Sequence, residues 1–227
     1  MKYFKYVLLV TAVLYSILSF SQVKNLDVDL TNYKYPFDVK FIVLKVQQQQ
    51  LKMAYMDVQS ANPNGKTIVL LHGKNFNGAY WRQTAKELSN SGFRVVIPDQ
   101  IGFGKSSKPE SFQYTFQQLA ENTKKILDTL GIQSATILGH SMGGMLATRF
   151  ALMYPNITEK LVLENPIGLE DWKLVVPYQS VDDWYKRELG QSYEKIKSYQ
   201  LKSYYDGKWK PEYDEWANLL AGWTLNK

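Results

Sequence analysis

The sequence of 227 residues contains no cysteine, and this absence excludes several classes of site. A chain without cysteine has no disulfide framework, no thiolate ligands for a metal ion and no thiol nucleophile. Arginine-rich stripes are also absent and most lysines stand singly, so the net charge of +6 indicates a solvated basic surface rather than a nucleic-acid site. No metal-ligand cluster, phosphate loop or dinucleotide fingerprint occurs, so we expect no metal ion and no cofactor. The apolar fraction of 45% is ordinary for a globular domain.

The first residues have the pattern of a secretory signal peptide. Lys2 and Lys5 precede an apolar run at 7–20, and the small residues Ser19 and Ser21 lie at its end. The run is too short for a comfortable membrane span. We therefore expect cleavage near Ser21 and export to the periplasm or the medium, with an uncleaved membrane anchor as the alternative. Cleavage would lower the net charge to +4, because this segment holds two lysines and no acid.

Beyond this segment the pattern predicts strands first and then strands that alternate with helices. Two β-rich runs around the polar stretch 47–50 predict an antiparallel hairpin. Thr115, with Gln118 three residues later, forms a capping box at a helix start. The expected strands lie at 39–46, 51–58, 67–71, 93–97, 135–138 and 160–163, and the expected helices at 79–90, 115–130 and 142–154. Such alternation predicts an α/β fold with a mostly parallel sheet and helices on both of its faces.

The strongest signal of chemistry is the segment Gly139-His140-Ser141-Met142-Gly143, which fits G-x-S-x-G between a predicted strand and a predicted helix. In such a turn the serine has a strained backbone that lifts its hydroxyl clear of the sheet. Gly139 and Gly143 leave the space that the neighbouring strand and helix need. The helix N-terminus also favours the negative charge that develops in acyl transfer. Ser141 is therefore the candidate nucleophile.

Together with this segment, Leu71-His72-Gly73 and Asp99–Ser106 resemble the α/β-hydrolase fold family, in its cap-bearing branch with a serine nucleophile. The resemblance implies hydrolysis of a small apolar ester or related acyl bond through an acyl-enzyme at Ser141, with cleavage of a carbon–carbon bond in a diketone-like substrate included. It also implies an oxyanion hole of two backbone N–H groups. One would come from Met142 and the other from Lys74, with Asn75 as the second choice.

Other polar residues near these segments have structural interpretations. His72 would shape the oxyanion loop, since it directly precedes the loop glycine, Gly73. His140 would pack or bind backbone, because adjacent residues on a sharp turn point apart. Asp99 would hold the loop that follows it. Glu164 is the candidate acid of the triad, because some members of the family place their acid at the end of this strand; a structural or pocket-lining role is the alternative.

The resemblance implies the order serine, acid, histidine, but no histidine follows Ser141. The two histidines of the chain are His72 and His140. A serine hydroxyl without an adjacent base is a weak nucleophile, so we expect the chain alone to be inactive. The last strands of the family pattern are missing as well. A truncated gene, a fragmentary sequence or completion by another polypeptide would each explain this pattern.

The expected organisation is a signal peptide at 1–21, the α/β-hydrolase core at 22–167 and an incomplete helical cap, rich in aromatic residues, at 168–227. The alternative to an enzyme is a non-catalytic ligand-binding relative that keeps the fold and the pocket without the triad. Neither the substrate nor the oligomeric state follows from the sequence.

Overall fold

The computed structural model describes residues 23–174 and 176–226, so the predicted signal peptide lies outside the described residues. These residues form two compact units. The larger unit holds residues 26–190 with Asn226, and the smaller holds residues 23–25 with 191–225. In neither unit is a described helix both long and apolar enough to cross a bilayer.

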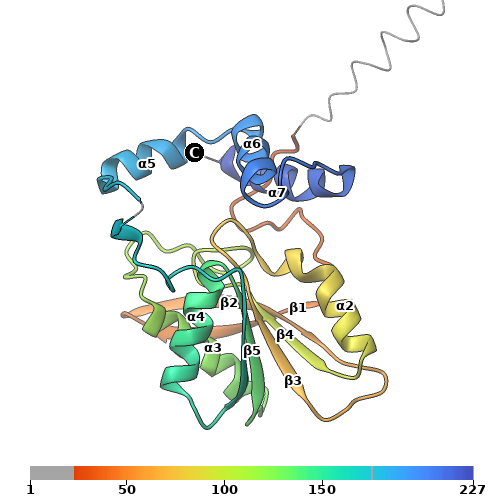
Figure 1. Cartoon of the computed structure of the whole chain (residues 1–227). Coiled ribbons are helices and arrows are strands. Elements are labelled where there is room, and N and C mark those ends of the chain that lie inside the picture. Colours follow the sequence, from red (N-terminus) through yellow and green to blue (C-terminus); the bar gives the residue numbers. More distant parts are fainter. Residues whose placement is uncertain (1–22, 175, 227) are drawn as a thin grey trace, which may run out of the picture. The chain divides into compact units, whose positions relative to one another are not determined.

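The larger unit is built around a mixed sheet of six strands in the order β1-β2-β4-β3-β5-β6 (Figure 1). The strands are β1 (Val39–Val46), β2 (Gln49–Val58), β3 (Thr67–Leu71), β4 (Arg94–Pro98), β5 (Ala135–His140) and β6 (Thr158–Glu164). The β1–β2 and β2–β4 pairs are antiparallel, whereas β4, β3, β5 and β6 run parallel to one another. The predicted α/β fold and its N-terminal antiparallel hairpin are confirmed.

A two-residue turn sets the register of the hairpin. Gln47 and Gln48 have φ angles of 49° and 60°, and this left-handed geometry matches the twist of the flanking strands. The amide of Gln47 also exchanges two hydrogen bonds with the backbone of Gln113, at 3.1 and 2.8 Å. The polar stretch therefore has a structural role, and β2 begins two residues earlier than predicted because Gln49 already pairs with Val46.

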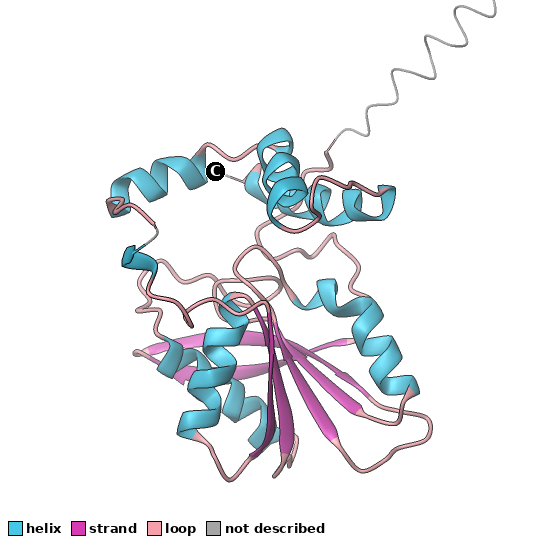
Figure 2. Cartoon of the chain, viewed as in Figure 1, coloured by secondary structure: helices cyan, strands magenta, loops and turns pink. Residues whose placement is uncertain are grey.

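Helices cover both faces of the sheet, with α2 (Arg82–Asn90) on one face and α3 (Phe116–Thr129) and α4 (Met142–Met153) on the other (Figure 2). Thr115 caps α3, since its hydroxyl accepts a hydrogen bond of 3.1 Å from the Gln118 N–H. The prediction of one helix over 79–90 is wrong in its first turn. A 3-10 turn, η1 (Gly78–Trp81), precedes α2 and begins where the Asn77 side chain accepts a hydrogen bond of 3.0 Å from the Ala79 N–H.

The main core lies between the sheet and helices α3 and α4. Val69, Leu71 and Ile137 of the central strands pack in one cluster with Leu146 and Phe150 of α4, and all five are fully buried. Burial of each such side chain contributes about 1.5–3 kcal/mol. The core thus holds the carboxyl ends of the parallel strands, where ligands bind in sheets of this kind, on a rigid base.

After β6 the described residues are helical or irregular, and they contain no further strand. The turn η2 (Trp172–Leu174) and helix α5 (Val181–Leu189) belong to the larger unit, whereas α6 (Tyr193–Ser203), the turn η3 (Pro211–Tyr213) and α7 (Asp214–Thr224) form the smaller one. The smaller unit has its own core of Ile196, Ala217 and Ala221. The helical character predicted for this stretch is confirmed.

Candidate active site

Ser141 lies in a sharp turn between β5 and α4, with φ of 55° and ψ of −119°. For a residue with a side chain this conformation costs about 1–3 kcal/mol and persists only where the surroundings impose it. The Ser141 N–H donates to the Glu164 carbonyl at 3.2 Å, and its own carbonyl accepts from the N–H groups of Gly144 at 2.9 Å and Ile167 at 3.3 Å. These bonds hold the strained serine at the carboxyl edge of the sheet.

Two glycines make this turn sterically feasible. A Cβ atom on Gly139 would lie 2.0 Å from the carbonyl oxygen of Gly143, and one on Gly143 would lie 2.1 Å from the carbonyl oxygen of Leu71. Both distances are far below van der Waals contact, and both partners are backbone atoms. The first turn of α4 therefore packs directly on β3 and β5, which is possible only with glycine at these positions.

The loop after β3 adjoins the nucleophile. A Cβ atom on Gly73 would lie 3.1 Å from the Cβ of Ser141 and 3.3 Å from Nδ1 of His140. Lys74 is the next residue of this loop, which the Phe76 N–H closes by donating to the Gly73 carbonyl at 3.2 Å. On the other side of the turn, Met142 begins α4, and the N–H groups of a first helical turn have no partner within their helix.

His72 joins two loops with both of its ring nitrogens. Nδ1 is 2.9 Å from the Gly73 carbonyl oxygen, and Nε2 accepts a hydrogen bond of 3.1 Å from the Gln100 N–H. Because Nε2 accepts, the ring proton is on Nδ1 and the imidazole is neutral. Complete burial lowers the pKa of His72, although the charge of Asp99 opposes this shift. Neither nitrogen is available to take a proton from Ser141.

His140 lies among aromatic rings beside the nucleophile. Its ring centroid is 5.7 Å from that of Phe76, 6.4 Å from that of Tyr80 and 6.5 Å from that of Trp81. Burial lowers the pKa of His140, and the charge of Glu164 acts in the opposite direction. The side chain is therefore a neutral, packed group at pH 7.

Asp99 connects three segments through one buried carboxylate. It accepts hydrogen bonds from the Tyr35 hydroxyl at 2.7 Å, from the Gly78 N–H at 2.6 Å and from the Lys105 N–H at 2.7 Å. Burial and the charge of Asp99 both raise the pKa of Tyr35, so the phenol remains a donor. Gly104 has φ of 52°, and a Cβ there would lie 2.1 Å from the Asp99 carboxylate. The carboxylate fixes the loop after β4, η1 and the N-terminal segment relative to one another.

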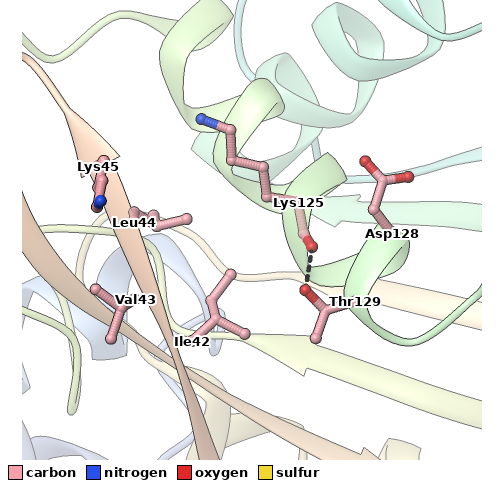
Figure 3. A pocket seen from close by; sticks show the side chains of 7 residues that line it. All are labelled: Ile42, Val43, Leu44, Lys45, Lys125, Asp128 and Thr129. Carbon is pink, nitrogen blue, oxygen red and sulfur yellow. Dashed lines mark hydrogen bonds between the residues drawn. The ribbon is translucent and has the colours of Figure 1, made fainter.

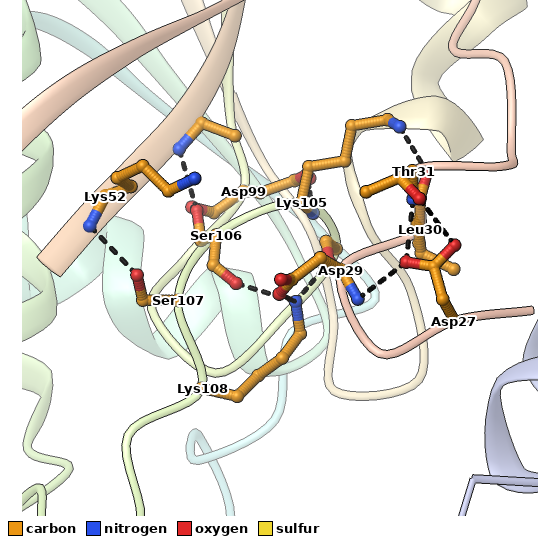
Figure 4. A network of polar contacts seen from close by, with 12 residues as sticks. Asp27, Asp29, Leu30, Thr31, Lys52, Asp99, Lys105, Ser106, Ser107 and Lys108 are labelled. Carbon is orange, nitrogen blue, oxygen red and sulfur yellow. Dashed lines mark hydrogen bonds and ion pairs between the residues drawn. The ribbon is translucent and has the colours of Figure 1, made fainter.

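Two lysines extend this network along the loop after β4 (Figure 4). Lys105 Nζ donates to the carbonyl of Leu30. Lys108 Nζ donates to the carbonyls of Gly104 and Ser106, both at 2.6 Å. Burial lowers the pKa of both lysines. Sequence reasoning missed this role, because isolated lysines carry no local signal of buried carbonyl partners.

Glu164 ends β6, and its side chain is exposed while its backbone carbonyl binds Ser141. It therefore lies beside the nucleophile, next to Asn165, whose φ is 40°. No three histidine, aspartate or glutamate side chains of the described ranges gather as ligands for a metal ion.

A separate hollow lies between β1 and the end of α3 (Figure 3). Residues 42–45 of β1 line one side, and Lys125, Asp128 and Thr129 of α3 line the other. The Thr129 hydroxyl donates a hydrogen bond of 2.8 Å to the Lys125 carbonyl, so its donor is already satisfied within α3. None of the residues around Ser141 contributes to this hollow.

Comparisons of the sequence and of the structure with known proteins point to one family. The family model described as alpha/beta hydrolase fold matches residues 66–188. The structure of a probable hydrolytic enzyme from Pseudomonas aeruginosa PAO1 is 50% identical, with a TM-score of 0.88, and the match covers 90% of this chain and 66% of that one. The 2-hydroxy-6-oxononadienedioate/2-hydroxy-6-oxononatrienedioate hydrolase of Comamonas testosteroni is 35% identical over 108 residues, which are 46% of this chain and 38% of that protein.

At the level of fold alone, the naproxen esterase of Bacillus subtilis is also similar, with 21% identity, a TM-score of 0.61 and coverage of 85% of this chain and 63% of that one. The chain thus spans less than two thirds of the length of each of these proteins, and 38% of the Comamonas hydrolase. The family model covers more than half of the chain, including both glycines of the serine turn. The chain belongs to the α/β-hydrolase fold family.

Proposed function

We propose that this chain is the nucleophile-bearing part of a serine hydrolase that acts on a small apolar ester or a related acyl compound. The observation that carries the proposal is the strained backbone of Ser141, with φ of 55°, held between Gly139 and Gly143. Backbone strain of about 1–3 kcal/mol persists mainly at functional positions, and a serine in such a strained turn between a strand and a helix is the arrangement that exposes a nucleophile.

In the proposed reaction the Ser141 hydroxyl oxygen bonds to the carbonyl carbon as its proton passes to a base. The oxyanion that forms accepts hydrogen bonds from the backbone N–H groups of Met142 and Lys74, with Asn75 as the second choice. The N-terminus of α4 adds a favourable field. The bond to the alcohol then breaks, the alcohol leaves with the proton from the base, and water hydrolyses the acyl-enzyme.

The base is assigned to a histidine outside these 227 residues. His72 has both ring nitrogens bonded to backbone, and His140 is packed among aromatic rings. Glu164, beside the nucleophile, is the proposed acid that would orient the missing histidine. The chain alone then lacks turnover, although an oxyanion hole without a working triad still accelerates attack about 10³–10⁴-fold over water.

A second substrate class fits the same machinery. The Comamonas relative is named for a 6-oxo substrate, which carries a ketone. Hydrolysis of a ketone breaks a carbon–carbon bond at a carbonyl carbon, and an oxyanion hole serves that step as it serves ester hydrolysis. A serine, rather than a carboxylate, at position 141 is compatible with both reactions.

We extend the proposal to export, so protein recovered outside the cytoplasm would begin near Gln22.

Labelling with a fluorophosphonate tests the proposal, because the reagent loses fluoride when an activated serine oxygen attacks phosphorus. Intact mass would be followed for the chain and for Ser141→Ala. The expected result is one slowly formed adduct on the chain and none on the variant. Equal labelling of both proteins, or none on either, would instead favour the non-catalytic ligand-binding relative.

A further inference from the structure

The oxyanion loop has a second contact, made by the side chain of Lys74 with helix α5. Lys74 Nζ lies 2.6 Å from Oε1 of Glu188 and 5.6 Å from the ring centroid of Trp184. Loop and helix belong to the same compact unit. The residue whose backbone N–H is assigned to the oxyanion hole is thus bound through its side chain to a helix more than 100 residues further along the chain.

The groups that face Lys74 are held in place by contacts within α5 and its preceding turn. Ser180 caps the helix, since its hydroxyl accepts from the Asp183 N–H at 3.1 Å. The Arg187 guanidinium lies 3.7 Å from the Trp184 ring centroid and donates to the Gln179 side chain at 2.9 Å. The ring of Trp184 is therefore held by Arg187, and Glu188 follows four residues later on the same helix.

The contact between Lys74 and α5 is weak enough to open. The side chains of Lys74 and Glu188 are 49% and 41% exposed, and exposed ion pairs are weak and screened by salt. Three apolar residues of α5, Val181, Tyr185 and Leu189, are also exposed rather than packed. An isolated helix of nine residues is marginal in water, so α5 would lose its hydrogen bonds once released.

We propose that Lys74, Trp184 and Glu188 form a latch that holds α5 on the oxyanion loop, and that Glu188 is a positioning residue for the Lys74 backbone N–H. Release of α5 would then also disrupt the geometry of the oxyanion hole. Salt would promote this release, because it screens the ion pair. The catalytic consequence rests on the proposed function of Ser141, whereas the contact between α5 and the loop does not.

Hydrogen exchange of the α5 amides tests the latch without reference to catalysis. Glu188→Gln removes the charge, and Glu121→Gln is the matched control, because Glu121 forms an exposed ion pair of 3.1 Å with Lys125 on α3. We expect exchange in α5 to be about two-fold faster in Glu188→Gln and unchanged in the control. High salt should bring the wild-type chain to the rate of Glu188→Gln. Equal α5 exchange in the wild type and Glu188→Gln would overturn the latch.

The positioning role is tested by the rate of fluorophosphonate labelling at increasing reagent concentration. Glu188→Gln should lower the limiting rate about two-fold and leave the half-saturating concentration unchanged, because one opening event governs both readouts and their combined change cannot exceed the about five-fold that an exposed pair contributes. The exchanged pair Lys74→Glu with Glu188→Lys restores the ion pair but not the contact with Trp184, so it should recover part of both the limiting rate and the slow exchange of α5. Faster exchange with an unchanged limiting rate would overturn the positioning role. A wild-type chain with no adduct would reject the proposed function, while the exchange experiment would still decide the latch.

Discussion

Replacement of Asp99 by alanine is expected to lower the free energy of unfolding by about 2–6 kcal/mol. The carboxylate is 1% exposed and accepts from the Tyr35 hydroxyl and from the N–H groups of Gly78 and Lys105. Each buried donor left without an acceptor costs about 1–3 kcal/mol. The first two donors are buried and the third is only partly buried, which gives the stated range. This loss is a large share of the about 5–15 kcal/mol typical of a whole domain.

Two further variants separate this network from a general effect of removing a charge. Tyr35→Phe deletes one donor to a charged acceptor and should cost about 1.5–3 kcal/mol. Asp128→Ala removes a carboxylate that is 52% exposed and paired with Lys124 on the surface of α3. Such a pair contributes at most about 1 kcal/mol, so this variant is the control.

Urea unfolding followed by tryptophan fluorescence measures these differences. With a slope of about 2–3 kcal/mol per molar urea, the midpoint should fall by about 1–3 M for Asp99→Ala. If Asp99→Ala failed to fold, Tyr35→Phe would still report on the network. An Asp99→Ala variant that unfolds within about 1 kcal/mol of the wild type, or a Tyr35→Phe variant no less stable than Asp128→Ala, would contradict this role of Asp99.

Three other predictions follow from the same contacts. Burial lowers the pKa of His72 below 6.5, so the unfolded chain binds that proton first. Stability should therefore fall as the pH drops from 7 to 5, by up to about 1.4 kcal/mol per pH unit for this histidine, and identical urea midpoints at both pH values would contradict this. Thr115→Ala should cost about 1 kcal/mol, because it removes the cap of α3, whereas Thr115→Ser should restore most of it in the same assay. Gly143→Ala should abolish soluble folded protein, because its Cβ would lie 2.1 Å from the Leu71 carbonyl oxygen; a soluble variant as stable as the wild type by urea unfolding would contradict this.

The elements that the sequence predicts well are those with local causes. The short apolar runs 67–71 and 135–138 are strands, the first almost fully buried and the second alternating between buried and half-buried residues, and polar or glycine residues bound each. The serine turn is visible for the same reason, since Gly139 and Gly143 are required within two residues of Ser141. The turn η1 also had a local signal, the cap residue Asn77, which the helical spacing of the following residues obscured.

Contacts between distant residues could not be predicted in this way. Tyr35 and Asp99 are 64 residues apart, and Lys74 and Glu188 are 114 apart, so no local pattern relates them. Only the folded chain brings the members of each pair together. The neutral state of His72, with a hydrogen bond at each ring nitrogen, likewise follows only from the position of the Gln100 N–H in the folded chain.

Chemical rescue tests whether Ser141 is the nucleophile of this site and needs only a proton acceptor to react. Imidazole added to the medium can take the place of a missing histidine side chain as proton acceptor. We expect the rate of fluorophosphonate labelling to rise with imidazole concentration in the wild-type chain, and Ser141→Ala to gain no adduct at any concentration. A labelling rate that does not change with imidazole, or an adduct that persists in Ser141→Ala, would contradict it.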